Sequence, residues 1–211
     1  MTLDGLGLAL GTAFAAGLNV YATVATLGLL HRFGVVTLPP SLDPMGHPAV
    51  LGVAIALYVV EFLADKIPYI DNVWDVVHTF IRPPAAAVLG YAAVAGVPDG
   101  WRIAAALLAG GVALTSHTTK AATRAAVNTS PEPVSNSAVS LFEDGIAIGL
   151  VWLAASYPVL TLAVVTVLVL VAIWALWKLL GLLRRVYAGP PRARGSGEDA
   201  TRFGAGKETR R

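Results

Sequence analysis

No charged side chain occurs between Val159 and Trp177, a segment composed mostly of Val, Leu, Ala and Ile. A helix needs about 20 mostly apolar residues to cross the hydrocarbon core of a bilayer. Charged residues make up 13% of the whole chain, whereas a typical soluble domain contains about 25%. The sequence therefore predicts an integral membrane protein, and it argues against a cytosolic enzyme or a nucleic-acid-binding protein with a basic face.

Six apolar stretches are long enough to be candidate membrane spans. They cover residues 3–30, 48–64, 75–97, 101–122, 137–156 and 159–177. Pro83 and Pro84 interrupt the third stretch, because proline lacks the amide proton that a helix interior needs. We expect an all-α protein, a polytopic membrane helical bundle of about six transmembrane helices in residues 1–187. A disordered basic tail is expected in residues 188–211.

Basic residues are unevenly distributed along the chain. Nine of the fifteen Lys and Arg residues lie between Lys178 and the C-terminus. Because Lys and Arg are enriched on the cytoplasmic side of membrane spans, an even number of spans places both termini in the cytoplasm. The expected location is the bacterial inner (plasma) membrane. The expected partners are the lipid bilayer, anionic lipid at the tail and a small ion or polar solute, and no nucleic acid.

The first apolar stretch contains small and polar residues that suit helix contacts. Gly7 and Gly11 are spaced four apart, which permits close approach of a second helix. Asn19 and Tyr21 lie near the middle of the stretch. Each of these two polar side chains either faces an internal polar site or bonds to a neighbouring helix.

Charged residues within the apolar body occur in two blocks, the first of which is mainly acidic. Asp71, Asp75, His78 and Arg82 recur at helical spacing, which predicts one continuous stripe, with Asp71 as the N-cap of its helix. The candidate site residues of this block are Glu61, Asp65, Lys66, Asp71, Asp75, His78 and Arg82.

The second block begins with basic residues. The candidate residues from His117 to Asn128 recur at helical spacing and share one helix face. The prolines on either side of Glu132 prevent a helix at that point. We therefore expect Ser135 or Asn136 to cap the helix that follows. The candidate site residues of this block are His117, Lys120, Arg124, Asn128, Ser130, Glu132, Asn136, Glu143 and Asp144.

The opposite charges of the two blocks predict that they pair with each other. Ionisable groups within membrane spans are costly and commonly mark ion pathways or binding sites. The alternative is that the pairs only hold helices together. We favour a binding site or a proton or ion pathway, because the blocks contain more ionisable groups than helix packing requires.

Two halves of the chain show weak internal similarity. The segment from Val60 to Asp65 can be aligned with that from Val139 to Asp144, and each half contains three candidate spans. Repeats with an odd number of spans are inverted in the membrane, as in many transporters. We therefore consider two inverted repeats, at residues 1–98 and 101–185.

The two blocks also resemble a known family. The motifs that carry the resemblance are Glu61-x3-Asp65-Lys66-x-Pro68-x2-Asp71-x2-Trp74-Asp75-x2-His78-Thr79-x2-Arg82-Pro83 and His117-x2-Lys120-x3-Arg124-x3-Asn128-Thr129-Ser130-Pro131-Glu132-Pro133-x-Ser135-Asn136-x6-Glu143-Asp144. They are similar to those of the bacterial integral-membrane family called domain of unknown function 4126, over about residues 5–185. The resemblance implies a membrane protein with this set of polar residues and carries no established activity.

Three functions are compatible with these observations. We favour a transporter or channel-like protein for a small ion or polar solute over an intramembrane enzyme that acts on a lipid phosphate. The third function is a structural or assembly protein with internal ion pairs only. The sequence contains no Walker-type loop, zinc-protease motif or nucleophile elbow, so we expect no cofactor and no catalytic residues. A metal site of acidic residues stays open.

Overall fold

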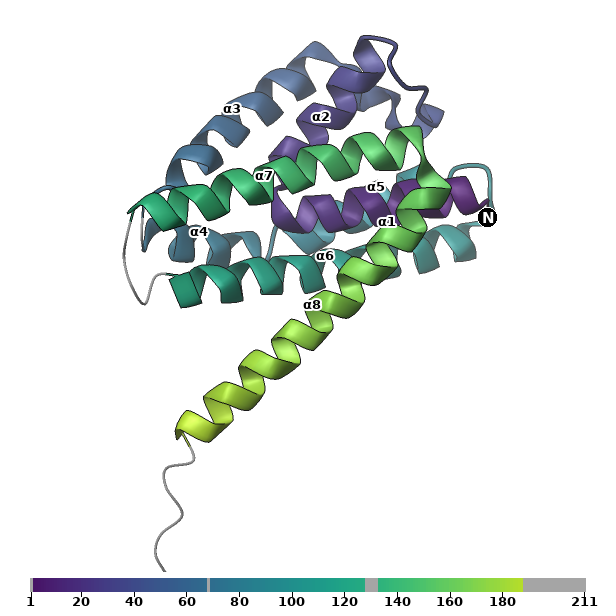
Figure 1. The fold of residues 1–211 in the computed structure, drawn as a ribbon. Helices are drawn as coiled ribbons and strands as arrows, with labels where there is room; N and C mark the ends of the chain where they lie inside the picture. Colours follow the sequence, from purple (N-terminus) through teal and green to yellow (C-terminus); the bar gives the residue numbers. More distant parts are fainter. Residues whose placement is uncertain (1, 68, 128–132, 188–211) are drawn as a thin grey trace, which may run out of the picture. The chain divides into compact units, whose positions relative to one another are not determined.

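The computed structural model describes residues 2–67, 69–127 and 133–187, and every regular element in these residues is a helix (Figure 1). The all-α prediction is therefore confirmed. The elements are α1 (Leu3–Leu18), α2 (Val20–Arg32), the 3-10 helix η1 (Pro40–Gly46), α3 (Pro48–Ala64), α4 (Ile70–His78), α5 (Arg82–Ala93), α6 (Asp99–Val127), α7 (Pro133–Ser156) and α8 (Pro158–Tyr187).

The chain divides into two compact units, Met1–Leu176 and Trp177–Arg211. The first unit contains the helices from α1 to α7 and most of α8. In the second unit the described residues are the last part of α8, up to Tyr187. The predicted tail at residues 188–211 lies outside the described residues.

Helix α1 lies at the centre of the first unit and packs against α5, α6 and α7 (Figure 1). Its sequence explains this position, because most of its buried positions are occupied by alanine and glycine, which let neighbouring helices approach closely. A Cβ atom on Gly7 would overlap the carbonyl of Pro158, and one on Gly11 would overlap Thr161 and Ala154. The predicted role of these two glycines in close packing is confirmed.

We expect Gly17→Ala to lower the free energy of unfolding by about 1–3 kcal/mol, the usual cost of overpacking a core. The new methyl group would overlap the Ser116 hydroxyl and the carbonyl of Ala113. The matched control is Gly52→Ala in α3, where a Cβ atom meets open space. Equilibrium unfolding in detergent micelles measures both changes. Equal stability of the two variants would contradict the close contact between α1 and α6.

The first apolar stretch forms two helices instead of one, because the chain bends at Asn19. This residue has extended backbone angles (φ −154°, ψ 102°) and its side-chain oxygen accepts a hydrogen bond of 2.8 Å from the amide of Ala22. It therefore serves as the N-cap of α2, a role that asparagine fills well.

A second break separates α4 from α5. Helix α4 ends at His78 and α5 begins at Arg82, so the prediction of one continuous helical stripe from Asp71 to Arg82 is wrong. Pro83 and Pro84 lie in the first turn of α5, where proline is tolerated because its missing N–H has no helical partner in any case. The chain thus breaks before the prolines.

Two expected helix caps are also wrong. The N-cap of α4 is Tyr69, in the left-handed region at φ 72°, and Asp71 lies in the first turn of that helix. Helix α7 already begins at Pro133, so Ser135 and Asn136 lie inside it. In both cases the helix starts earlier than the polar residue that could have capped it.

Two helices are long and apolar enough to cross a membrane. They are Val134–Ser156 in α7 and Pro158–Leu182 in α8. Pro40–Gly46 and Pro48–Ala64 pass the same test as one bent pair with an angle of 64°, and Leu3–Leu18 is apolar but shorter. The described helices thus include two or three that are able to span a membrane, and this supports membrane association.

Candidate functional site

Candidate residues from both sequence blocks meet in the interior of the first unit. They come from α3, α4, α5, α6, α7 and the turn that follows α3. The buried members are Glu61, Asp65, Asp71, Asp75, His78, Arg82, His117, Lys120, Arg124, Asn136, Glu143 and Asp144, which we call the polar network. Lys66 is partly exposed and its ammonium lies over the ring of Phe62. The candidates Asn128, Ser130 and Glu132 lie outside the described residues.

Arg82 is the first cation of the network, placed by the break between α4 and α5. Its Nη2 atom lies 2.6 Å from Oε1 of Glu61, and its Nη1 atom lies 2.7 Å from Nδ1 of His117. Nη1 also donates to the carbonyl of Gly17 at 3.2 Å and to Oδ1 of Asp75 at 3.3 Å. One guanidinium therefore joins α1, α3, α4 and α6.

The contact with Arg82 fixes the form of the His117 ring. A guanidinium can only donate hydrogen bonds, so Nδ1 of His117 must be an unprotonated acceptor. The proton of the neutral ring then lies on Nε2, which donates to Oγ1 of Thr79 at 2.8 Å. The Thr79 hydroxyl in turn donates to the carbonyl of Asp75 at 3.0 Å. His117 is thus a neutral bridge in this arrangement.

Lys120 is the second cation and is completely enclosed by other groups. Its Nζ atom lies 2.8 Å from Oδ2 of Asp65 and 3.0 Å from the carbonyl of Leu18. Oε1 of Glu61 lies 3.6 Å away and Oε2 of Glu143 lies 4.0 Å away. The ammonium therefore interacts with carboxylates from both blocks.

Arg124 is the third cation, one helical turn beyond Lys120 on α6. Its Nη2 atom donates to Oε2 of Glu143 at 2.6 Å, and Nη1 donates to Oδ1 of Asn136 at 2.8 Å. Nη1 also donates to the carbonyl of Asp65 at 2.9 Å, and Oδ2 of Asp71 lies 3.9 Å away. Arg124 thereby holds the end of α3 against α6 and α7.

The break at Asn19 is part of the network. The last carbonyls of a helix have no partner within that helix, and the helix dipole favours cations there. At the end of α1, Gly17 and Leu18 accept hydrogen bonds from the buried arginine of α5 and the buried lysine of α6. The side-chain amide of Asn19 donates to Oδ1 of Asp144 at 2.9 Å. Asn19 thus bonds to a neighbouring helix and, because Asp144 belongs to the network, also faces the internal polar site.

Two polar contacts have no role in the sequence prediction. The Ser116 hydroxyl donates to the carbonyl of Phe14 at 2.9 Å, and the Thr79 hydroxyl accepts a hydrogen bond from Nε2 of His117. The hydroxyl of the residue directly before His117, in a helix of mostly apolar residues, was the available signal for Ser116. Such a signal is weak, because serine and threonine also bond within their own helix.

The network contains twice as many carboxyl groups as cations among the described residues. Six carboxyl groups are buried, against Arg82, Lys120 and Arg124. The two histidines add no full charge in their neutral forms. One oxygen each of Glu61, Asp65, Asp75 and Asp144 has no hydrogen-bond partner. Since uncompensated buried charge is strongly unfavourable, the arrangement favours uptake of protons or small cations.

The described part of the chain contains no cluster of side chains that is suited to bind a metal ion. No set of three His, Asp or Glu side chains there has an arrangement able to hold a metal ion. The carboxylates instead face arginine and lysine side chains.

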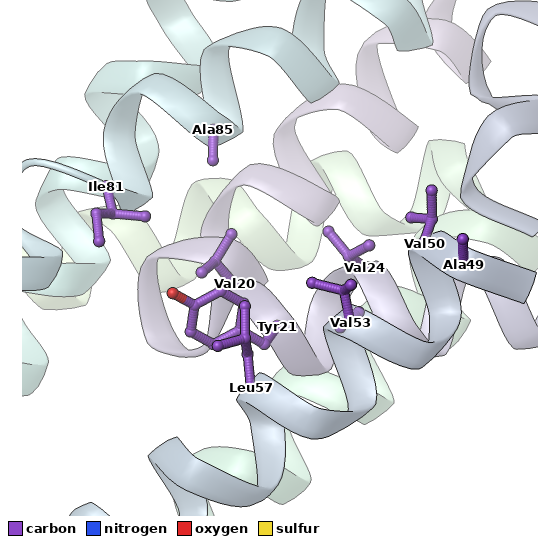
Figure 2. Close-up of a pocket in the computed structure, with 10 residues that line it drawn as sticks. Val20, Tyr21, Val24, Ala49, Val50, Val53, Leu57, Ile81 and Ala85 are labelled. Carbon is purple, nitrogen blue, oxygen red and sulfur yellow. The ribbon is translucent and has the colours of Figure 1, made fainter. Parts of the chain in front are cut away.

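An apolar groove of about 510 Å³ lies between α2, α3 and α5 and reaches the edge of the network (Figure 2). Val20, Val24 and Val53 are among its lining residues, and Tyr21 carries a polar group there. The Tyr21 hydroxyl lies 3.3 Å from Nε2 of His78, whose Nδ1 donates to a carbonyl of its own helix. Tyr21 therefore connects the apolar groove to the buried charges.

Comparison with known families identifies the chain. The model of the family called domain of unknown function 4126 (DUF4126) matches residues 6–178. The chain belongs to the DUF4126 family. The match includes both blocks that form the polar network, and it confirms the resemblance found in the sequence. No curated protein and no solved structure matches this DUF4126 chain.

Proposed function

We propose that this DUF4126 protein is a polytopic protein of the bacterial inner membrane that moves a small ion or polar solute through its polar network. The observation that carries the proposal is the excess of buried carboxyl groups over buried cations. Bound protons or cations would neutralise the extra negative charge of these carboxyl groups. Their release would leave that charge uncompensated again. Intramembrane ionisable groups of this kind commonly mark ion pathways.

The helix breaks support a membrane arrangement with six spans. The spans are α1 with α2, η1 with α3, α4 with α5, and the single helices α6, α7 and α8. Irregular backbone at membrane depth is tolerated where it is buried in protein or lines a cavity. At both breaks, near Asn19 and at residues 79–81, polar groups form hydrogen bonds with residues of other helices inside the protein. Both termini lie in the cytoplasm, with the basic tail at anionic lipid, and residues 1–98 and 101–185 form inverted repeats.

The three cations supply the counter-charge in this scheme. Arg82, Lys120 and Arg124 hold Glu61, Asp65 and Glu143, and the other carboxyl groups exchange protons or cations with water. Movement of an ion requires these pairs to open and close again, so the carboxylates and cations change partners during transport.

A structural or assembly function is the second candidate. The observation in its favour is that the closest ion pairs are short, at 2.6, 2.8 and 2.6 Å. In that case the network only holds the helices together. An intramembrane enzyme for a lipid phosphate has less support, because each of the three buried cations already contacts a carboxylate.

Flux measurements distinguish the two candidates. The full-length protein is reconstituted into liposomes with a trapped pH-sensitive dye, and an ionic gradient of protons, sodium or potassium is imposed. We expect wild-type protein to dissipate one of these gradients and Glu61→Gln to reduce the rate at least tenfold, because this variant removes a central carboxylate.

Asp99→Asn is the matched control, since Asp99 is 78% exposed and lies in the first turn of α6, away from the network. Its flux should equal that of the wild type. No flux from the wild type, or equal flux from wild type and Glu61→Gln, would support the structural function instead.

A further inference from the structure

Asp144 differs from every other buried carboxyl group that the structure describes. The other five each lie within 4.0 Å of Arg82, Lys120 or Arg124. Within residues 2–67, 69–127 and 133–187, no cation lies within this distance of Asp144, although the residue is only 4% exposed. A buried carboxylate without an ion pair is unfavourable, so this position favours a bound positive charge.

The immediate surroundings of Asp144 contain few hydrogen-bond partners. Oδ1 accepts a hydrogen bond of 2.9 Å from the side-chain amide of Asn19, and Oδ2 has none. Ser140 lies one helical turn earlier on the same buried face of α7, and its hydroxyl also has no partner. Two polar atoms without hydrogen-bond partners therefore belong to residues one helical turn apart on α7, a helix that packs against α1 and α2.

The ionisable groups around Asp144 come from several helices. Lys120 from α6 and Glu61 and Asp65 from α3 and its end act on it electrostatically over longer distances. Tyr58 in α3 and Lys66, just after the end of α3, also interact with it electrostatically. Glu143 precedes it in α7 and pairs with Arg124, whereas α1 and α2 present the uncharged Asn19.

A metal cation does not suit this position, because hard cations require several oxygen ligands. The carbonyls of Gly17 and Leu18 at the end of α1 already accept from cations. The oxygen of Asn19 accepts from the amide of Ala22. A proton needs only one carboxyl oxygen.

We propose that Asp144 is a proton-binding site at the break between α1 and α2, and that the proton is the ion that this protein moves or couples to. The inference rests on the proposed transport function. In the binding step a hydronium ion gives its proton to Oδ2 of Asp144, an O–H bond forms, and water is released. Release reverses the step and restores the carboxylate.

Opposing influences make this exchange reversible. Burial away from cations favours the neutral acid. The N-terminus of α2 and the amide of Asn19 favour the carboxylate, because a helix N-terminus carries partial positive charge. The surroundings of Asp144 therefore stabilise both its neutral and its charged form. A group that binds and releases protons requires such a balance.

Infrared difference spectroscopy of the full-length protein in detergent tests the site directly. We expect a band of a protonated carboxyl group near neutral pH that shifts in heavy water and that is lost or reduced in Asp144→Asn. The band should persist in the control variant Asp99→Asn and should not change when sodium replaces choline. An unaltered band in Asp144→Asn, or its loss on addition of sodium, would overturn the proposal.

A second measurement does not depend on the folding of a variant. Wild-type protein is prepared with carbon-13 aspartate, and the carboxyl band is expected to shift to lower frequency. An unshifted band would assign the proton to a glutamate, and absence of the band near neutral pH would exclude the site. These readouts need no flux, so failure of the transport assay and failure of the proton site are distinguishable.

Discussion

Replacing Arg82 with methionine is expected to lower the free energy of unfolding by about 3–5 kcal/mol, the usual cost of leaving a buried charge without its partner. Methionine keeps an apolar side chain of similar length but removes every donor. Glu61 then loses its 2.6 Å contact, and His117 and the carbonyl of Gly17 lose their donor. Equilibrium unfolding in mixed micelles and the yield of folded protein measure the effect.

Arg102→Met provides the control for this variant. Arg102 pairs with the exposed Asp99 at 3.6 Å and lies over the ring of Tyr91. Exposed ion pairs contribute about 0–1 kcal/mol, so its loss should be small. If Arg82→Met were no more destabilising than Arg102→Met, the buried network would not hold the helices together.

Replacing Lys120 with methionine is expected to cost a similar 3–5 kcal/mol, again because carboxylates remain buried without a cation. A second substitution, Asp65→Asn, should restore part of the loss by removing the carboxylate that lies 2.8 Å from the ammonium. Direct neighbours in such cycles have coupling energies of about 0.5–3 kcal/mol. Unfolding of the two single variants and the double variant measures this coupling.

The two single variants of this cycle should differ sharply. Carboxyl groups are in excess in the network, so Asp65→Asn alone is expected to be far less destabilising than Lys120→Met. Equal costs for the two single variants would show that cations and carboxylates are balanced, contrary to the charge count. A double variant whose loss of stability equals the sum of the two single losses would show that the two groups are not coupled.

The sequence allowed the helical class and the convergence of the two polar blocks to be predicted, because both depend on charge and hydropathy. His117, Lys120 and Arg124 share the buried face of α6, as their spacing indicates. The helix breaks were harder to predict. Asn19 lies within a long apolar stretch, and the bend there is supported by contacts with residues far along the chain, such as Asp144.

The stripe from Asp71 to Arg82 shows a different limit of sequence analysis. Its residues follow helical spacing and all become buried, yet α4 ends at His78 and α5 begins at Arg82. Tertiary contacts of Arg82 and Thr79 decide the path of the backbone there. Local spacing identifies which residues face the interior, but not whether they belong to one helix.

The carbonyls at the end of α1 have a consequence for biosynthesis. Leu18 leaves the ribosome before its partner Lys120, which follows 102 residues later. Until α6 has been synthesised, the end of α1 has no such donor and remains a target for quality-control proteases. Chains that stop before α6 should therefore be degraded, and coexpression of the missing C-terminal segment should protect them.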